Sequence, residues 1–168
     1  DLARLREAIR ASKRELAARR NVEEAMQTLI PGARLMTCSG FGAAIIKLIK
    51  PAWTTDRDDG ILNTNCIFFS LWVDPGAEKS GRALYNVHAK KLRLLKGPEF
   101  ASREFVRAFR TACRGELESW PGLSFPKGPV TLFQGHIPLD RTTLGSATSA
   151  LMDRFAHIAP IIDRMLAV

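Results

Sequence analysis

Four short apolar segments follow one another between residues 35 and 89, and this succession constrains the fold more than any other feature of the chain. Each segment is six to eight residues long, a typical strand length, and glycines or polar loops separate the segments. The predicted strands are 35–41, 44–49, 66–73 and 84–89. Because consecutive strands with short connections usually pair with their neighbours, we expect an antiparallel or mixed sheet.

Helical patterns flank this block on both sides. Residues 2–20 carry leucine and isoleucine at helical intervals, and a second short helix is expected to run to residue 29. Residues 97–115 and the segment that begins at residue 144 also place apolar residues along one face, and Pro160 is expected to kink the last helix or to begin a new turn. One more strand is predicted at 130–139, between these two helices.

The predicted order of elements is therefore α-β-β-β-β-α-β-α, which is typical of the α+β class. We expect a single domain over residues 1–168, with a four- to five-stranded mixed or antiparallel sheet packed by N-terminal, central and C-terminal helices. The length of 168 residues suits one domain, and a hydrophobic content of 46% is enough to build its core.

The positive charge of the chain is concentrated in one window. The formal net charge is +8, and residues 82–114 hold nine basic residues against two acidic ones, a net charge of +7. Such a concentration produces a directed electrostatic field and favours an anionic partner.

Four arginines are spaced four, three and four residues apart within this window, so they share one side of the predicted helix. The opposite side carries an apolar stripe, which is expected to face the core. The arginines are Arg103, Arg107, Arg110 and Arg114, and the stripe is Ala101, Phe105, Ala108, Phe109, Ala112 and Cys113. We expect all four guanidinium groups to point outward, so that Arg107→Ala and Arg110→Ala would leave stability nearly unchanged. Local ion pairs are expected from Glu99 to Arg103 and from Glu104 to Arg107.

This pattern leads to the hypothesis of a non-catalytic binding module whose basic helix face engages nucleic acid. Arginine forks match phosphate oxygens, and a regular row on a rigid helix suits a polyanion with repeating charge. An adaptor that binds an acidic protein surface is an open alternative, as are a solvated helix face and pairing of the arginines within the chain or in a dimer. The candidate interface residues are Lys90, Lys91, Arg93, Lys96, Arg103, Arg107, Arg110 and Arg114. The hypothesis involves no catalytic residue, cofactor or metal.

A second alternative is enzymatic. If the strands 66–73 and 84–89 pair antiparallel, Asp58 or Asp59 would approach His88 and Lys90. In element order the chain resembles the metal-dependent PD-(D/E)xK nucleases, which place an acid and an acid-x-lysine pair on such neighbouring strands. His88 stands where the second metal-binding carboxylate belongs, so the resemblance implies a degenerate site, and we expect no cleavage of nucleic acid.

Several other classes of protein are not indicated. No apolar run approaches the roughly 20 residues of a membrane span, and the first residues show no signal-peptide pattern. Cys38, Cys66 and Cys113 are far apart and form no C-x-x-C pair, which argues against a zinc finger or a disulfide framework. Small buried thiols and a cytoplasmic location are expected instead.

Overall fold

The computed structural model describes residues 34–40, 43–54, 67–95, 101–126, 128, 130–140 and 142–167. The helices predicted before residue 30 lie outside this range, as do Asp58, Asp59, Lys96 and Glu99.

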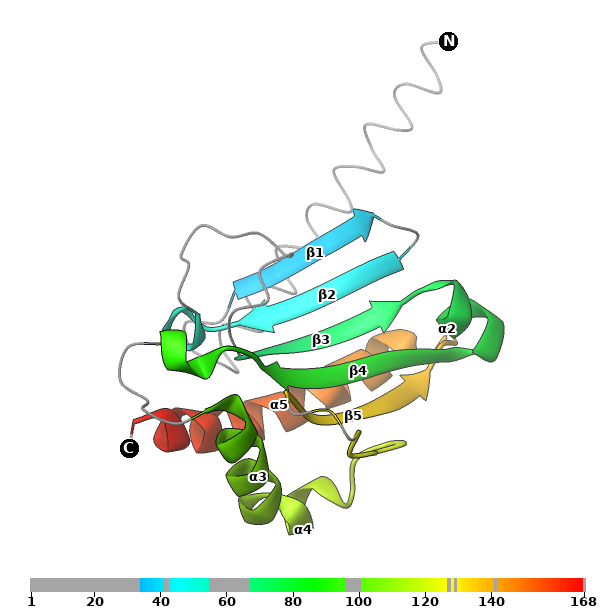
Figure 1. The fold of residues 1–168 in the computed structure, drawn as a ribbon. Coiled ribbons are helices and arrows are strands. Elements are labelled where there is room, and N and C mark those ends of the chain that lie inside the picture. Colours follow the sequence, from blue (N-terminus) through cyan, green and yellow to red (C-terminus); the bar gives the residue numbers. More distant parts are fainter. Residues whose placement is uncertain are drawn as a thin grey trace.

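The described strands form an antiparallel sheet in the simple order β1-β2-β3-β4-β5 (Figure 1). Each strand pairs with the next one along the chain, and each predicted boundary lies within two residues of the observed one. The strands are β1 Arg34–Gly40, β2 Ala43–Ile49, β3 Ile67–Val73, β4 Arg82–Ala89 and β5 Thr131–Pro138. The connection from β4 to β5 contains helices, and after it β5 pairs antiparallel with β4 at the edge of the sheet.

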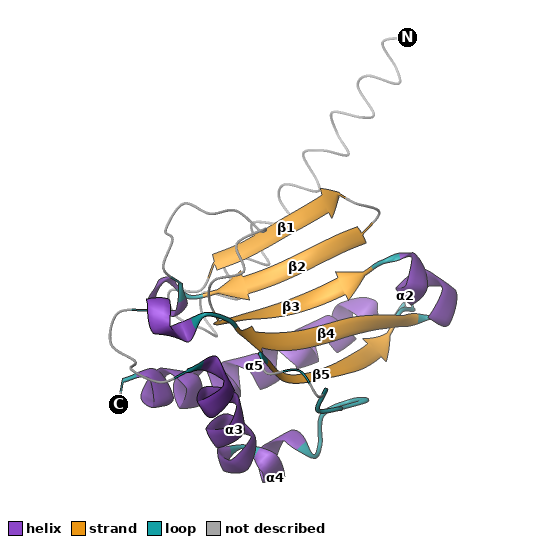
Figure 2. Cartoon of the chain, in the orientation of Figure 1, coloured by secondary structure: helices purple, strands orange, loops and turns teal. Residues whose placement is uncertain are grey.

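The longest helix lies against one face of this sheet, other helices lie at its β5 edge, and a short one joins β3 to β4 (Figure 2). Helix α5 crosses behind the strands, and α3 contacts β4, β5 and α5. The helices are α2 Pro75–Ser80, α3 Ser102–Ala112, α4 Arg114–Leu117 and α5 Leu144–Leu166, with 3-10 turns η1 Pro51–Trp53 and η2 Leu92–Leu94. The α+β class is confirmed, and none of the helices in the described segments is long and apolar enough to cross a membrane.

The connection between β3 and β4 differs from the prediction. The sequence around Asp74 indicates a turn, but the structure has the short helix α2 there. The Asp74 carboxylate accepts a hydrogen bond from the Ala77 N–H at 2.7 Å, and Pro75 occupies the first helical position. Gly81 ends the helix at φ 67°, a left-handed conformation that suits glycine. An Asp-Pro pair begins turns and helices alike, and here the N-terminal cap favours the helix.

The core lies between the sheet and helix α5. Phe69 of β3 stacks on Phe155 of α5 with ring centroids 4.3 Å apart, and both side chains are fully buried. Alternate residues of β3 and β4 therefore face α5, and the residues between them face the opposite side of the sheet. Helix α5 continues through Pro160, which is exposed.

Candidate binding groove on helix α3

The four arginines of the predicted row line one open groove of about 1010 Å³ between helix α3 and the segment that precedes β5. No acidic residue is present among the described residues that line this groove. The lining consists of Arg103, Val106, Arg107, Arg110, Thr111, Arg114, Phe125 and Gly128, and we call it the arginine groove. The structure therefore brings together residues that come from α3, from the start of α4 and from the loop before β5.

Helix α3 is oriented by the apolar residues on its other side. Phe105, Val106, Phe109 and Cys113 are buried, and Phe109 stacks on Phe133 of β5 with ring centroids 6.1 Å apart. The expected stripe was too wide, because Ala108 and Ala112 are exposed. The large side chains define the buried face, since they remove most of the apolar surface from water.

The row is not carried by a single helix. Helix α3 ends at Ala112, the chain turns at Cys113, and Arg114 begins the short helix α4, which continues through Gly115. The predicted helix end near Gly115 was therefore wrong by about three residues. Burial raises the pKa of the Cys113 thiol to about 11, with a smaller contribution from Glu116, so this cysteine stays protonated and is a structural residue.

Arg110 does not behave as an outward-facing arginine. Its Nε donates to the carbonyl of Leu132 at 2.8 Å, and its Nη2 donates to the carbonyls of Pro126 at 2.9 Å and Thr131 at 2.7 Å. The side chain is partly buried, and burial lowers the pKa of its guanidinium. Arg110 thus connects α3 to the start of β5 and to the loop before it, which corrects the expectation that all four arginines point outward.

The other three arginines differ from Arg110 in their described surroundings. Arg103, Arg107 and Arg114 are exposed, and within the described part of the chain no hydrogen bond or ion pair involves their side chains. The expected pair between Glu104 and Arg107 does not form. The Glu104 carboxylate instead accepts a hydrogen bond from the Ala101 N–H at 2.9 Å, as in half of a capping box.

Among the basic residues upstream of α3 that the structure describes, none lines the arginine groove. Lys91 and Arg93 are exposed and line a separate, smaller groove at the N-terminal end of α3, whereas Lys90 is partly buried at the end of β4. The Leu92 N–H donates to Ser102 Oγ at 3.1 Å, which attaches η2 to the start of α3.

One further residue of the groove is aromatic. From the sequence a core role is the default for Phe125, with base stacking as the alternative if the ring is exposed; in the structure 42% of this residue is exposed, and it lies beside the guanidinium of Arg110. The Arg110 Cζ atom is 5.4 Å from the centroid of its ring, a distance typical of a cation–π contact. The neighbouring prolines and glycines indicate a loop, and loops run over the protein surface, so an aromatic side chain there is more often exposed.

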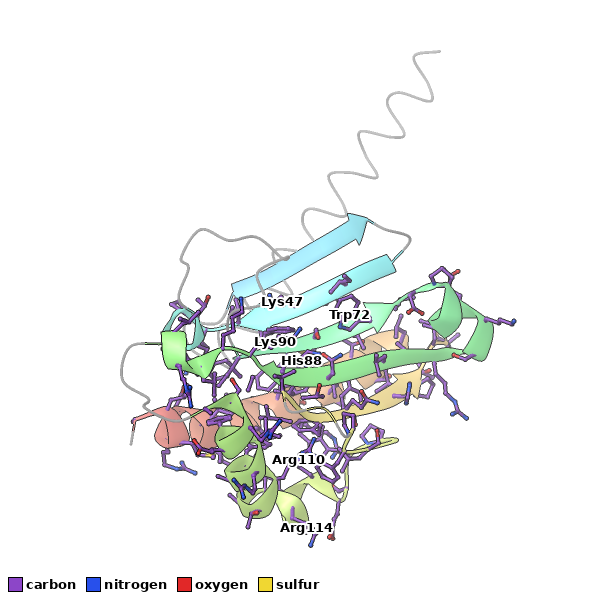
Figure 3. All side chains as sticks on the ribbon, in the orientation of Figure 1. Lys47, Trp72, His88, Lys90, Arg110 and Arg114 are labelled. Atoms are coloured by element: carbon purple, nitrogen blue, oxygen red, sulfur yellow. The ribbon has the colours of Figure 1, made fainter. Side chains whose placement is uncertain are left out.

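The face of the sheet opposite α5 carries a polar cluster around His88 (Figure 3). Strands β3 and β4 pair antiparallel, as the nuclease hypothesis requires, and Phe68 lies opposite His88. Thr131 Oγ1 is 3.0 Å from His88 Nδ1, and the buried side chains of Ser70 and Asn86 share a hydrogen bond. Desolvation lowers the pKa of His88 to about 4, and the charges of Lys90 and Lys47 contribute in the same direction, so His88 is neutral at pH 7.

The other half of that hypothetical site lies outside the described residues, since Asp58 and Asp59 belong to it. Among the residues that the structure describes, no group of three or more His, Cys, Asp or Glu side chains could hold a metal ion.

Comparison with known proteins identifies no relative. No protein-family model, curated protein or solved structure matches this chain. The functional argument therefore rests on the groove itself.

Proposed function

We propose that this protein is a non-catalytic binding module that engages nucleic acid through the arginine groove. The observation that supports this proposal is that four arginines and no acidic side chain are found among the described residues of the groove lining. A guanidinium group binds phosphate through two parallel N–H donors, and it keeps its charge at any physiological pH.

The dimensions of the row suit a polyanion. Arg103 and Arg107 are four residues apart in helix α3, or about 6 Å along its axis, and Arg114 follows after the turn at Cys113. One strand of a duplex carries a phosphate about every 3.4 Å along the axis, so about two such steps separate the phosphates that Arg103 and Arg107 reach. Exposed ion pairs contribute little to stability, which leaves ligand binding as the stronger physical reason for three exposed arginines in one groove.

The test is the salt dependence of binding to a fluorescently labelled oligonucleotide. With Arg110 engaged in the fold, three arginines are available, and the log–log slope on duplex DNA is expected to be about −2.7. Arg103→Ala and Arg107→Ala should each reduce the magnitude of the slope by about 0.9. Arg82→Ala serves as the matched control, because Arg82 is an exposed arginine at the start of β4, outside the groove.

The same assay distinguishes the two alternatives. If an acidic protein competes for binding to the groove but oligonucleotides do not, the adaptor hypothesis is supported and our proposal is refuted. Cleavage of DNA or RNA in Mg²⁺ or Mn²⁺ that Lys90→Ala abolishes would support the nuclease hypothesis.

A further inference from the structure

We infer that the ligand of the arginine groove is single-stranded nucleic acid, and that Phe125 is the platform on which one of its bases stacks. This inference rests on the proposed function and adds the class of nucleic acid and the residue that recognises it. Its basis is the presence of an exposed aromatic ring among the arginines, in a groove that would need no such ring to bind phosphate alone.

The position of Phe125 is fixed by the fold. Ser124, the preceding residue, exchanges two backbone hydrogen bonds with Gln134 of β5, at 2.7 and 3.0 Å. Arg110 binds the carbonyl of Pro126, the following residue, and its guanidinium lies against the Phe125 ring. The residues before and after Phe125 in the sequence are therefore attached to the sheet and to helix α3, respectively. A preorganised ring loses little conformational entropy when a base stacks on it.

Arg110 accordingly has a different role from the other three arginines. All of its described hydrogen bonds go to backbone carbonyls of this chain, and it holds the loop that presents Phe125. We therefore describe Arg110 as a positioning residue, and Arg103, Arg107 and Arg114 as the phosphate contacts.

This arrangement favours a single strand over a duplex. In a duplex the faces of the bases are covered by their neighbours, so an exposed ring beside the backbone has nothing to stack on. A single strand offers both an accessible base and the phosphates that adjoin it. Proteins that bind single strands combine these two elements, a positive groove and an aromatic side chain, and stacking tolerates any base.

The experiment compares three ligands by fluorescence anisotropy at low salt: oligo(dT) of about 16 nucleotides, an abasic strand of the same length, and a duplex of that length. We expect Phe125→Ala to weaken binding of oligo(dT) by roughly 5- to 150-fold. Binding of the abasic strand and of the duplex should change less than about twofold, since neither offers a free base to the ring. Phe125→Trp should retain the affinity for oligo(dT), and Arg82→Ala should leave all three affinities unchanged.

The salt slopes separate this inference from the proposed function. Phe125→Ala should keep the wild-type slope on oligo(dT), whereas Arg107→Ala should reduce its magnitude by about 0.7. If oligo(dT) binds with a steep salt dependence but Phe125→Ala has no effect, or weakens all three ligands equally, the stacking inference is wrong and the proposed function stands. If none of the three ligands binds at low salt, the proposed function itself is wrong. Thermal melting checks the fold of each variant, and Phe125→Ala is expected to melt about 1–4 °C lower than the wild type, because it loses the exposed cation–π contact with Arg110.

Discussion

Replacement of Arg110 by alanine tests the most unexpected contact in the structure. The substitution removes three hydrogen bonds to the carbonyls of Leu132, Pro126 and Thr131, together with the contact to the Phe125 ring. A hydrogen bond from a charged donor contributes about 1.5–3 kcal/mol when buried. Arg110 is only partly buried, and two of its bonds share one nitrogen, so water replaces part of what is lost.

We therefore expect Arg110→Ala to lower the free energy of unfolding by about 2–3 kcal/mol in total. For a chain of this size that corresponds to a fall in the melting temperature of about 4–12 °C. Arg107→Ala is the matched control, because Arg107 is an exposed arginine one helical turn away whose side chain makes no hydrogen bond in the described structure. Its effect should stay within about 0.5 kcal/mol.

Denaturant unfolding and thermal melting measure both variants, and two further readouts locate the effect. Arg110→Lys should recover less than half of the lost stability, since an ammonium group cannot span the carbonyls that the planar guanidinium reaches. Amide hydrogen exchange should accelerate at Ser124 and Gln134 in Arg110→Ala, because the loop loses its attachment to α3. Equal melting temperatures for Arg110→Ala and Arg107→Ala would refute this reasoning and restore the expectation of four equivalent arginines.

Two other predictions concern the sheet. The His88 resonance should titrate near pH 4, because desolvation and the charges of Lys90 and Lys47 lower its pKa. Its folded pKa lies below the unfolded value of about 6.5, so the unfolded chain takes up the proton first and stability should fall as the pH drops from about 6.5 to about 4. Denaturant unfolding across that window checks this, and a flat profile in the wild type, or the same slope in His88→Asn, would contradict it. Gly135→Ala should destabilise the protein by about 1–3 kcal/mol, since the new Cβ would meet Tyr85 Oη and lie 2.7 Å from the Pro121 carbonyl oxygen. Gly115→Ala is the control, because a Cβ at Gly115 in helix α4 would meet nothing within 4 Å. This substitution should raise the free energy of unfolding by about 0.5–1 kcal/mol. Thermal melts that show no difference between the two glycine variants would disprove the clash at Gly135.

Much of the fold could be predicted from local patterns. The five strands lie within two residues of their predicted positions, because short apolar runs bounded by glycine and polar loops are local signals. The choice between turn and helix at Asp74 could not be made in the same way, since the cap bond from Asp74 to Ala77 forms only in the helix.

The candidate site was predicted in part. The spacing of the arginines predicted a common side, and all four line one groove. Lys91 and Arg93 were included because they are near in sequence, but they line a separate groove at the N-terminal end of α3. Proximity along the chain does not determine which groove a side chain enters, because η2 turns the chain before α3 begins.

The sequence by itself determined the order of the elements and the placement of positive charge along the chain. Only the tertiary structure decided which arginine serves the fold and which aromatic ring stays exposed. The bonds from Arg110 to Pro126, Thr131 and Leu132 join residues 16 to 22 positions apart, so they depend on how α3 packs against β5. Such long-range hydrogen bonds produce no periodic pattern in a sequence, because the donor and the acceptor meet only after the two elements have packed together.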